Sequence, residues 1–299
     1  MKKTALLLHN PKAGNEEHTK KSLIRLIEAG GFNCRYRSVK EDDWQHFEDS
    51  VDFLIVAGGD GTVRKVAAAL LDNKKVPGQL PIALLPLGTA NNISQSLNIH
   101  GEPDKIIESW HAYNLQPFDV GLLTGSDDVH YVLESFGYGV FPYLMAEMKK
   151  QDKEDLEDKD IKIKAALQLT HDIAHSYEPR ECHMVIDGQD HSGVYLLVEI
   201  MNIRSIGPNL FLSPFGDPGD GTFEVILIAK EDKDKFAAYI ENKINDTEIT
   251  YPFPSIKASD IQISWQGKHA HVDDEIIKLK KGAEITIQMQ KHALQFLVG

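Results

Sequence analysis

Cysteine is scarce in this sequence, with only Cys34 and Cys182 among its 299 residues. Two cysteines so far apart offer neither a disulfide framework nor the close spacing of a zinc site, so neither constraint is expected to define the fold. A low cysteine content is also typical of proteins in a reducing compartment, which predicts a cytoplasmic location.

Long apolar runs are absent too, because no stretch approaches the ~18–20 residues that a membrane-spanning helix requires. The chain begins with Lys2 and Lys3 and continues with apolar residues, as a signal peptide does. That apolar part is shorter than the ~7–15 residues of such a segment, and Asn10-Pro11 interrupts it. This start therefore predicts a first β-strand.

Basic residues are outnumbered, since 32 Lys and Arg stand against 45 Asp and Glu, a formal net charge of −13. Residues 1–120 carry 14 basic and 15 acidic residues, and the remainder carries 18 and 30. No basic stripe is visible, which argues against nucleic acid as the main partner. The negative field does not attract an anionic membrane, so any membrane contact must use a local patch.

What the sequence does contain is an ordinary globular composition, 42% hydrophobic and 26% charged, in a chain long enough for two domains. Residues 1–120 alternate short apolar runs, at 5–8, 53–57 and 82–85, with segments of helical periodicity. This alternation predicts an N-terminal α/β domain, residues 1–120, with a parallel sheet and helices on both faces.

The pattern changes near residue 119, and residues 121–289 are predicted to form a second, β-rich domain. Strands are expected at 119–123, 130–138, 181–187, 193–202, 222–229, 258–265, 269–279 and 283–289. Helical stretches near 142–176 and 232–244 interrupt them. The expected fold class is α/β plus β, with an antiparallel, sandwich-like C-terminal domain that carries helical insertions.

The strongest functional pattern is the run Gly58-Gly59-Asp60-Gly61-Thr62 between a predicted buried strand and a helix. Glycines let a ligand approach the backbone, and a helix N-terminus offers unpaired N–H groups to phosphate. Asp60 adds a carboxylate that can hold Mg²⁺ or its waters. The alternative is a tight turn that glycine and aspartate only shape, but the place at a strand's carboxyl end favours a ligand site.

Two more loops follow predicted strands at the same sheet edge, residues 10–14, Asn-Pro-Lys-Ala-Gly, and residues 86–91, Pro-Leu-Gly-Thr-Ala-Asn. Each alone could be an ordinary turn, but three such loops at one edge predict a polar cleft. None matches the GxGxxG fingerprint or the GxxxxGKS/T P-loop, which argues against a dehydrogenase or a P-loop NTPase.

Six elements in this order resemble the diacylglycerol kinase catalytic-domain family, bacterial lipid kinases related to sphingosine and ceramide kinases. The three loops resemble its Asn-Pro-x-Ser/Ala-Gly, Gly-Gly-Asp-Gly-Thr and Pro-x-Gly-Thr-x-Asn motifs, and residues 119–121, 212–223 and 271–275 resemble its later elements. The Gly-Gly-Asp-Gly-Thr motif alone is shared with NAD kinases, whereas all six elements in order are specific.

The resemblance implies an ATP site in the N-terminal domain, and it implies that the C-terminal segment 290–299 joins that domain. Residues 58–62 and Thr89 would lie at the phosphates, and Ser38 would lie near the nucleotide. The full predicted ATP-binding set is Asn10, Pro11, Lys12, Ala13, Gly14, Ser38, Gly58, Gly59, Asp60, Gly61, Thr62, Thr89 and Asn91.

The later elements imply catalytic and metal-binding residues. Glu275 matches the general base, and the predicted catalytic set is Glu275, Asp60 and Asp119. A structural Mg²⁺ is expected on Asp220 and the backbone carbonyls of Asp217 and Thr222. From the residues alone, Asp220 could instead shape a turn and Glu275 could be an exposed strand residue.

Two positions depart from the family's pattern. Asn92 stands where the family usually has an aspartate, which removes a carboxylate. Asp274 stands where the family's Val-Asp-Gly-Glu element has glycine, and aspartate is among the few residues that tolerate a positive φ there. Both departures bear on activity more than on fold.

The predicted activity is transfer of the γ-phosphoryl group of ATP to a lipid hydroxyl, with Mg²⁺ as cofactor, diacylglycerol as leading acceptor, and phosphatidic acid and ADP as products. The lipid tail is expected along a cluster that could equally be core: Phe136, Tyr138, Phe141, Tyr143, Leu144 and Met145. Expected partners are ATP, the lipid and, peripherally, the inner membrane face. Two alternatives stay open, an NAD kinase-like enzyme and a non-catalytic nucleotide- or lipid-binding protein.

Overall fold

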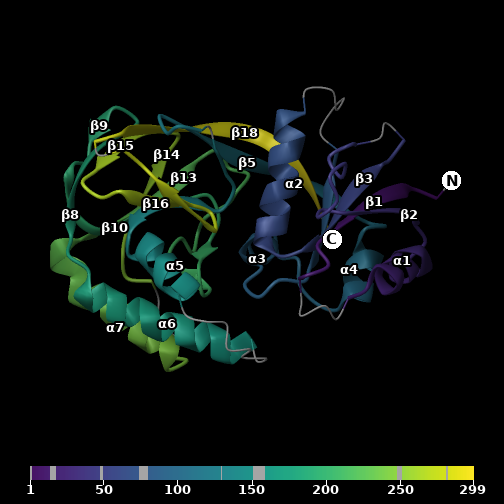
Figure 1. Ribbon diagram of the computed structural model, residues 1–299, viewed down its shortest axis with the longest axis horizontal. Coiled ribbons are helices and arrows are strands. Elements are labelled where there is room, and N and C mark those ends of the chain that lie inside the picture. Colours follow the sequence, from purple (N-terminus) through teal and green to yellow (C-terminus); the bar gives the residue numbers. More distant parts are fainter. Residues whose placement is uncertain are drawn as a thin grey trace. The chain divides into compact units, whose positions relative to one another are not determined.

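The computed structural model describes residues 2–13, 18–47, 50–73, 80–128, 130–150, 159–247, 251–280 and 282–299. By internal contacts the chain divides into two compact units. The first contains Met1–Asp119 and Lys291–Gly299, and the second contains Val120–Gln290 (Figure 1). Each unit has its own buried core.

The first unit contains four parallel strands in the order β2-β1-β3-β4, with helices in the connections. The strands are β1 (Thr4–His9), β2 (Asn33–Ser38), β3 (Phe53–Gly58) and β4 (Ile82–Pro86). The helices are α1 (Lys20–Ala29), α2 (Asp60–Asp72), α3 (Asn92–Ser96) and α4 (Pro103–Ser109). Because the strands are parallel, the loops that follow β1, β3 and β4 leave from one edge of the sheet.

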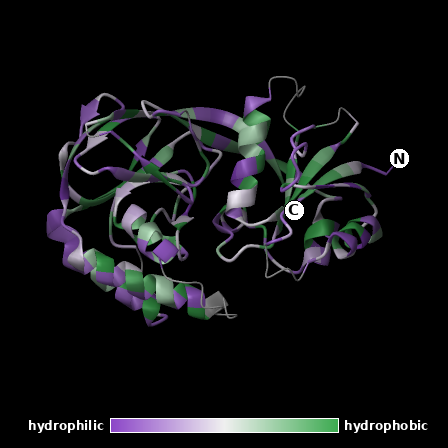
Figure 2. Cartoon of the chain, viewed as in Figure 1, coloured by the Kyte–Doolittle hydropathy of each residue, from purple (hydrophilic) through white to green (hydrophobic). Residues whose placement is uncertain are grey.

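The apolar runs of the first unit are buried on both faces of this sheet. Every residue of β3 is buried, and Figure 2 shows the strands as the hydrophobic part of the unit. Right-handed connections run in opposite directions from β1 to β2 and from β3 to β4, which puts α1 and α2 on opposite faces (Figure 1). Phe32, Phe53 and Trp110 pack edge to face, with ring centroids 5.4–5.9 Å apart.

The second unit is an antiparallel sheet with helices on one face. Its strands are β6 (His130–Val132), β7 (Ser135–Gly139), β8 (Arg180–Ile186), β9 (Gln189–Asp190), β10 (Gly193–Met201), β13 (Phe223–Ala229), β14 (Ser255–Ala258), β15 (Asp260–Trp265), β16 (His269–Val272) and β17 (Glu275–Lys278). A small separate ladder joins β11 (Ser205–Ile206) to β12 (Leu210–Phe211). Its helices are α5 (Val140–Lys150), α6 (Lys159–Ser176), a 3₁₀ turn at Lys230–Asp232, and α7 (Lys233–Ile244).

Strand β10 shows how this sheet separates two cores. Val198 and Ile200 lie in a cluster formed with residues of the neighbouring strands, whereas Leu197 and Met201 lie in a cluster formed with α5, α6 and α7. The alternation follows from the two-residue period of a strand. Helices α6 and α7 lie side by side along that second face (Figure 1). The fold class expected from the sequence, parallel α/β followed by antiparallel β with helical insertions, is confirmed.

A buried ion pair crosses the central strands of the second unit. Glu199 on β10 and His271 on β16 are both fully buried, and the His271 Nε2 atom lies 3.0 Å from each carboxylate oxygen of Glu199. Gly137 of β7 pairs with both residues, and a Cβ atom there would lie 2.1 Å from the Glu199 Oε1 atom. Glycine is therefore required at 137, and the pair anchors β16 to the core.

Two long strands carry the chain across the boundary between the units. β5 (Asn114–Thr124) leaves the first unit, and β18 (Glu284–Val298) returns to it, pairing with β15 through residues 284–288 and with β4 at Phe296. His292 has a positive φ of 52°, and its N–H donates to the Asp119 carboxylate at 2.6 Å. Through β18 a single hydrogen-bonded path links 16 strands, although internal contacts divide the chain in two.

Several strand boundaries differ from those expected. The predicted strand 258–265 is two strands, β14 and β15, which meet at Ser259, and the predicted strand 269–279 is the β16–β17 hairpin. Residues 151–158, inside the predicted helical stretch 142–176, lie outside the described residues. Within the described residues, none of the helices combines the length and the apolar character needed to span a bilayer.

Candidate functional site

The loop after β3 places a helix N-terminus at the carboxyl edge of the parallel sheet. Gly59 is the N-cap of α2, and its carbonyl accepts the N–H groups of Thr62 and Val63 at 2.8 and 3.2 Å. The first turn of a helix carries a partial positive charge and backbone donors without intrahelical partners. This end of α2 is therefore suited to bind an anion such as phosphate.

The loop after β4 touches the loop after β3 through backbone atoms alone. A Cβ atom on Gly88 would lie 2.5 Å from the Gly59 Cα atom, and one on Gly59 would lie 3.0 Å from the Gly88 Cα atom. A real Cβ atom does not fit at 2.5 Å from backbone, so no other residue can replace Gly88 without moving the loops apart. Gly59, which is predicted to lie at the phosphates, thus also joins two loops through its contact with Gly88.

Asn91 fixes the shape of the loop after β4. Its side-chain amide accepts the Gly88 N–H and donates to the Gly88 carbonyl, both at 2.9 Å. Asn91 itself is left-handed, with φ 53° and ψ 44°, and it is the N-cap of α3. Asparagine tolerates this conformation better than most residues do. The structure thus gives Asn91 a backbone-shaping role.

Asp60 binds the N-terminus of α3. Its Oδ2 atom accepts the Asn92 N–H at 2.9 Å and its Oδ1 atom accepts the Ile93 N–H at 3.1 Å. Asp60 therefore has a structural role, because each of its oxygens accepts a backbone donor, and its contact with Mg²⁺ stays a prediction. Asn92, which replaces the family's aspartate, supplies one of those donors and is itself buried.

The loop after β1 joins the same cluster. The Asn10 side-chain N–H donates to the hydroxyl of Thr62 at 3.2 Å, and the Asn10 carbonyl accepts the Ala13 N–H at 3.0 Å. Pro11 and Lys12 are exposed, whereas Thr62 is buried. Gly14, also predicted to bind ATP, lies outside the described residues. The structure thus brings together the three loops that the sequence singled out.

The remaining predicted nucleotide contacts differ in accessibility. Thr89 is exposed at the tip of the loop after β4. Ser38, at the end of β2, is buried, and its hydroxyl accepts the Lys40 N–H at 3.2 Å. A small pocket lies here, and its lining residues are Val56, Gly58, Gly59, Asp60, Val63, Leu84, Pro86, Asn91 and Ser94. Thr89 is therefore accessible to a ligand, as are Pro11 and Lys12.

His9 is a residue at this edge that the sequence did not mark. It ends β1 and is 1% exposed, and its Nδ1 atom lies 3.2 Å from the Tyr36 hydroxyl. Burial lowers the pKa of His9, so the ring is neutral near pH 7. Its only sequence signal is its place after an apolar run, which does not distinguish it from a core residue.

The β16–β17 hairpin in the second unit carries the predicted general base. The buried Asp273 carboxylate accepts the N–H groups of Leu133, Glu134 and Ser135 at 2.8–3.3 Å. Glu275 begins β17 and is exposed. The positive φ expected at Asp274 falls instead on Asp273, at 50°. Three backbone donors on one carboxylate hold the turn in place beside Glu275.

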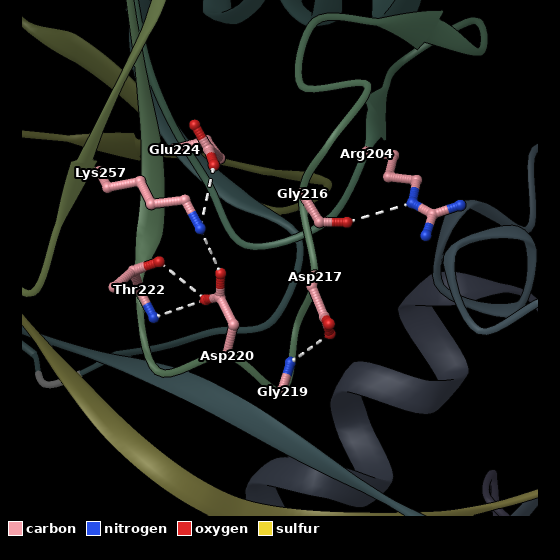
Figure 3. A network of polar contacts seen from close by, with 8 residues as sticks. All are labelled: Arg204, Gly216, Asp217, Gly219, Asp220, Thr222, Glu224 and Lys257. Carbon is pink, nitrogen blue, oxygen red and sulfur yellow. Dashed lines mark hydrogen bonds and ion pairs between the residues drawn. The ribbon is translucent and has the colours of Figure 1, made fainter.

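The predicted Mg²⁺ ligands do not form a metal site. The Asp220 carboxylate accepts hydrogen bonds from Thr222 and from the Lys257 ammonium, and the Asp217 carbonyl accepts the Asp220 N–H at 3.3 Å (Figure 3). Mg²⁺ requires oxygen ligands with free lone pairs and is repelled by an ammonium group. No group of three or more His, Cys, Asp or Glu side chains in the described ranges is arranged to hold a metal.

The predicted groove for the lipid tail is mostly core. Phe136, Tyr138, Phe141 and Leu144 are at most 2% exposed and pack among strands and helices. Only Tyr143, 49% exposed, offers substantial surface. The alternative interpretation of this cluster as hydrophobic core is therefore the correct one for these four side chains.

Comparison with known proteins agrees with this geometry. The chain is 24% identical to a diacylglycerol kinase of Bacillus subtilis (strain 168) over 98% of its own length and 96% of that protein's. The solved structure of a diacylglycerol kinase from Bacillus anthracis str. Sterne has a TM-score of 0.75 at 22% identity, covering 99% of this chain and 97% of that one. Yeast NADH kinase, solved with NADH, has a TM-score of 0.54 at 11% identity, covering 99% and 82%.

The solved structures of these two kinds of kinase share the fold of this chain. Residues 4–123 match the family model of the diacylglycerol kinase catalytic domain. This match confirms the resemblance to that family seen in the sequence, and the chain is an ATP-dependent kinase.

The contacts of Asp60 lead to a first prediction. Asp60→Ala leaves the Asn92 and Ile93 N–H groups without their acceptor, so it should lower the free energy of unfolding by about 1–3 kcal/mol as well as reduce activity. Urea denaturation measures the first effect. Asp42→Ala, an exposed aspartate of the same unit, serves as control and should change stability by less than ~0.5 kcal/mol. Equal stability of the two variants would contradict the structural role.

Proposed function

We propose that this kinase transfers the γ-phosphoryl group of ATP to the hydroxyl of a lipid, with diacylglycerol as the acceptor, giving phosphatidic acid and ADP. The observation that carries the proposal is the cluster of three loops, joined by the Asn10–Thr62 and Asp60–α3 hydrogen bonds and by the Gly59–Gly88 contact. The diacylglycerol kinase from B. subtilis, similar along nearly the whole chain, supports the choice of acceptor.

The N-terminus of α2 supplies the main attraction for the triphosphate. Its dipole and first-turn N–H groups favour negative charge, and the exposed Lys12 and Thr89 side chains can reach phosphate oxygens from the other two loops. Mg²⁺ arriving with ATP would neutralise charge that develops on the γ-phosphoryl group. Asp60 acts in this scheme as a positioning residue, because it fixes α3 and the loop before it.

Glu275 is the proposed general base. Its exposure allows a lipid hydroxyl to approach, and the hairpin that carries it is anchored by Asp273 and His271. A lipid hydroxyl is a weak acid, so the carboxylate takes the proton as the new P–O bond forms. Asp119 is fully buried and its carboxylate accepts the His292 N–H, so we assign it a positioning role within the first unit.

The acceptor is a membrane lipid, so the proposal includes peripheral contact with the inner membrane face from a cytoplasmic location. The side chain of Phe215 is 86% exposed, and an exposed aromatic ring is suited to the membrane interface. Nucleic acid has no place in this scheme, because the net charge is −13.

An NAD kinase-like activity is the second candidate, because yeast NADH kinase shares the fold. A lipid panel distinguishes the candidates. Purified protein is incubated with labelled ATP and Mg²⁺ and with mixed micelles of diacylglycerol, phosphatidylglycerol, ceramide or sphingosine, while NAD and NADH are assayed in parallel. We expect labelled phosphatidic acid to form from diacylglycerol, and we expect none to form when EDTA removes Mg²⁺.

Each other outcome of this panel has a definite meaning. A phosphorylated product from NAD or NADH alone would show that the acceptor is a dinucleotide and not a lipid. Transfer to another lipid would support a lipid kinase whose acceptor is not diacylglycerol. Binding of ATP with no transfer to any acceptor would leave the non-catalytic alternative.

Glu275→Gln tests the base directly. Removing the carboxylate should lower kcat by about 10²–10⁴-fold and leave the KM for ATP within a few-fold, because the proposed role is in proton transfer. The melting temperature should stay unchanged because the residue is exposed. Asp274→Asn, one residue away and also exposed, is the matched control and should retain near-normal kcat. A similar kcat in both variants means that Glu275 is not the base.

A further inference from the structure

The loop that leads into β13 contains Asp220, and both of its carboxylate oxygens accept hydrogen bonds. The Thr222 N–H and hydroxyl donate to the Asp220 Oδ1 atom at 2.9 and 2.7 Å. The Lys257 ammonium donates to the Oδ2 atom at 2.6 Å. Figure 3 shows the three donors converging on this one side chain, which is 26% exposed. Each oxygen of Asp220 thus has a protein donor at short distance.

Sheet register brings Lys257 to this position. In the antiparallel pair of β13 and β14, Lys257 lies directly opposite Glu224, so the two side chains share one face of the sheet. The Lys257 Nζ atom lies 3.9 Å from the Glu224 Oε1 atom, and Glu224 is buried. The ammonium therefore lies between two carboxylates, one from the turn and one from the strand (Figure 3).

Asp217, whose carbonyl is also expected to bind the metal, accepts two backbone hydrogen bonds. The Asp217 carbonyl accepts the Asp220 N–H at 3.3 Å, and the Asp217 Oδ1 atom accepts the Gly219 N–H at 2.9 Å. The Thr222 hydroxyl acts as a donor to Asp220. A cation at this point would have to displace these donors and approach an ammonium group, and both changes cost free energy.

We infer that the Lys257 ammonium is a built-in cation that takes the place of a structural Mg²⁺, so that the turn before β13 holds its shape without a metal. The charge of Asp220 is balanced by a group from the chain itself, which also lies 3.9 Å from Glu224. The inference concerns this loop alone and holds whichever acceptor the kinase uses.

The charge states of the pair agree with that arrangement. Burial works against the charge on Asp220, but hydrogen bonds from Lys257 and Thr222 outweigh it and lower its pKa. The hydrogen bond to Asp220 raises the pKa of Lys257. Both groups are therefore ionised near pH 7, as an ion pair requires.

Thermal unfolding of the full chain without nucleotide tests the inference, in EDTA and with excess Mg²⁺ or Mn²⁺. Wild type and Asp220→Asn should show the same metal response. Lys257→Met keeps the length of the apolar stem but removes the ammonium, so it should lower the melting temperature in EDTA by roughly 2–4 °C. Added metal should restore part of that loss in Lys257→Met, because binding to the folded state alone raises stability.

Two further variants separate charge from packing. Lys257→Arg keeps a cation beside Asp220 and should melt close to wild type with no gain from metal. Lys280→Met removes an ammonium that lies just as close to its partner, 2.6 Å from Asp127, but in a pair that is 81% and 75% exposed. Loss of so exposed a pair should leave the melting temperature nearly unchanged and create no metal response.

The opposite results would overturn the inference. If Mg²⁺ raises the melting temperature of the wild type more than that of Asp220→Asn, then Asp220 binds metal despite Lys257. Lys257→Met that melts like wild type in EDTA would show that the ammonium does not hold the loop. Lys257→Met that gains nothing from metal would show that the position does not accept a cation.

Discussion

The close approach of two backbones at the carboxyl edge of the parallel sheet is the constraint on which the nucleotide site depends. Gly59 and Gly88 touch through Cα atoms, and this contact sets where the loops after β3 and β4 lie. The Asn91 amide then fixes one loop, and the Asp60 carboxylate joins the other loop to α3. A phosphate site built on a helix N-terminus needs such fixed geometry, because helix-end interactions act only within the first turn.

Most of the carboxylates that the sequence marks as functional serve the protein's own backbone. Asp60 holds the N-terminus of α3, Asp119 holds the bend of β18, and Asp273 holds three N–H groups of the segment before β7. Asp220 completes the series with the Lys257 ammonium as its partner. Glu275 differs from these four because it is exposed, on a hairpin that Asp273 helps to anchor. Motif aspartates therefore act mainly as scaffold, and the proposed chemistry falls on one glutamate.

The fold class and the three-loop cluster could be predicted because both follow from local pattern. Apolar runs ending in glycine motifs indicate parallel strands, whose carboxyl ends share an edge. The partners of the carboxylates depend on distant segments. Asp60 meets Asn92 only after the loops close, and Lys257 meets Asp220 only through the register of β13 and β14. A single strand predicted over 258–265 omitted β14, and with it the lysine that pairs with Asp220.

The central claim is that the three loops together bind the nucleotide. Hydrogen–deuterium exchange with and without Mg·ATP tests this claim most directly. The account predicts slower exchange with ATP at the backbone N–H groups of residues 10–13, 59–63 and 88–93, since ligand contact and loop closure protect all three segments together. Protection confined to one loop, or no change at any of them under saturating nucleotide, would contradict a site built from the cluster.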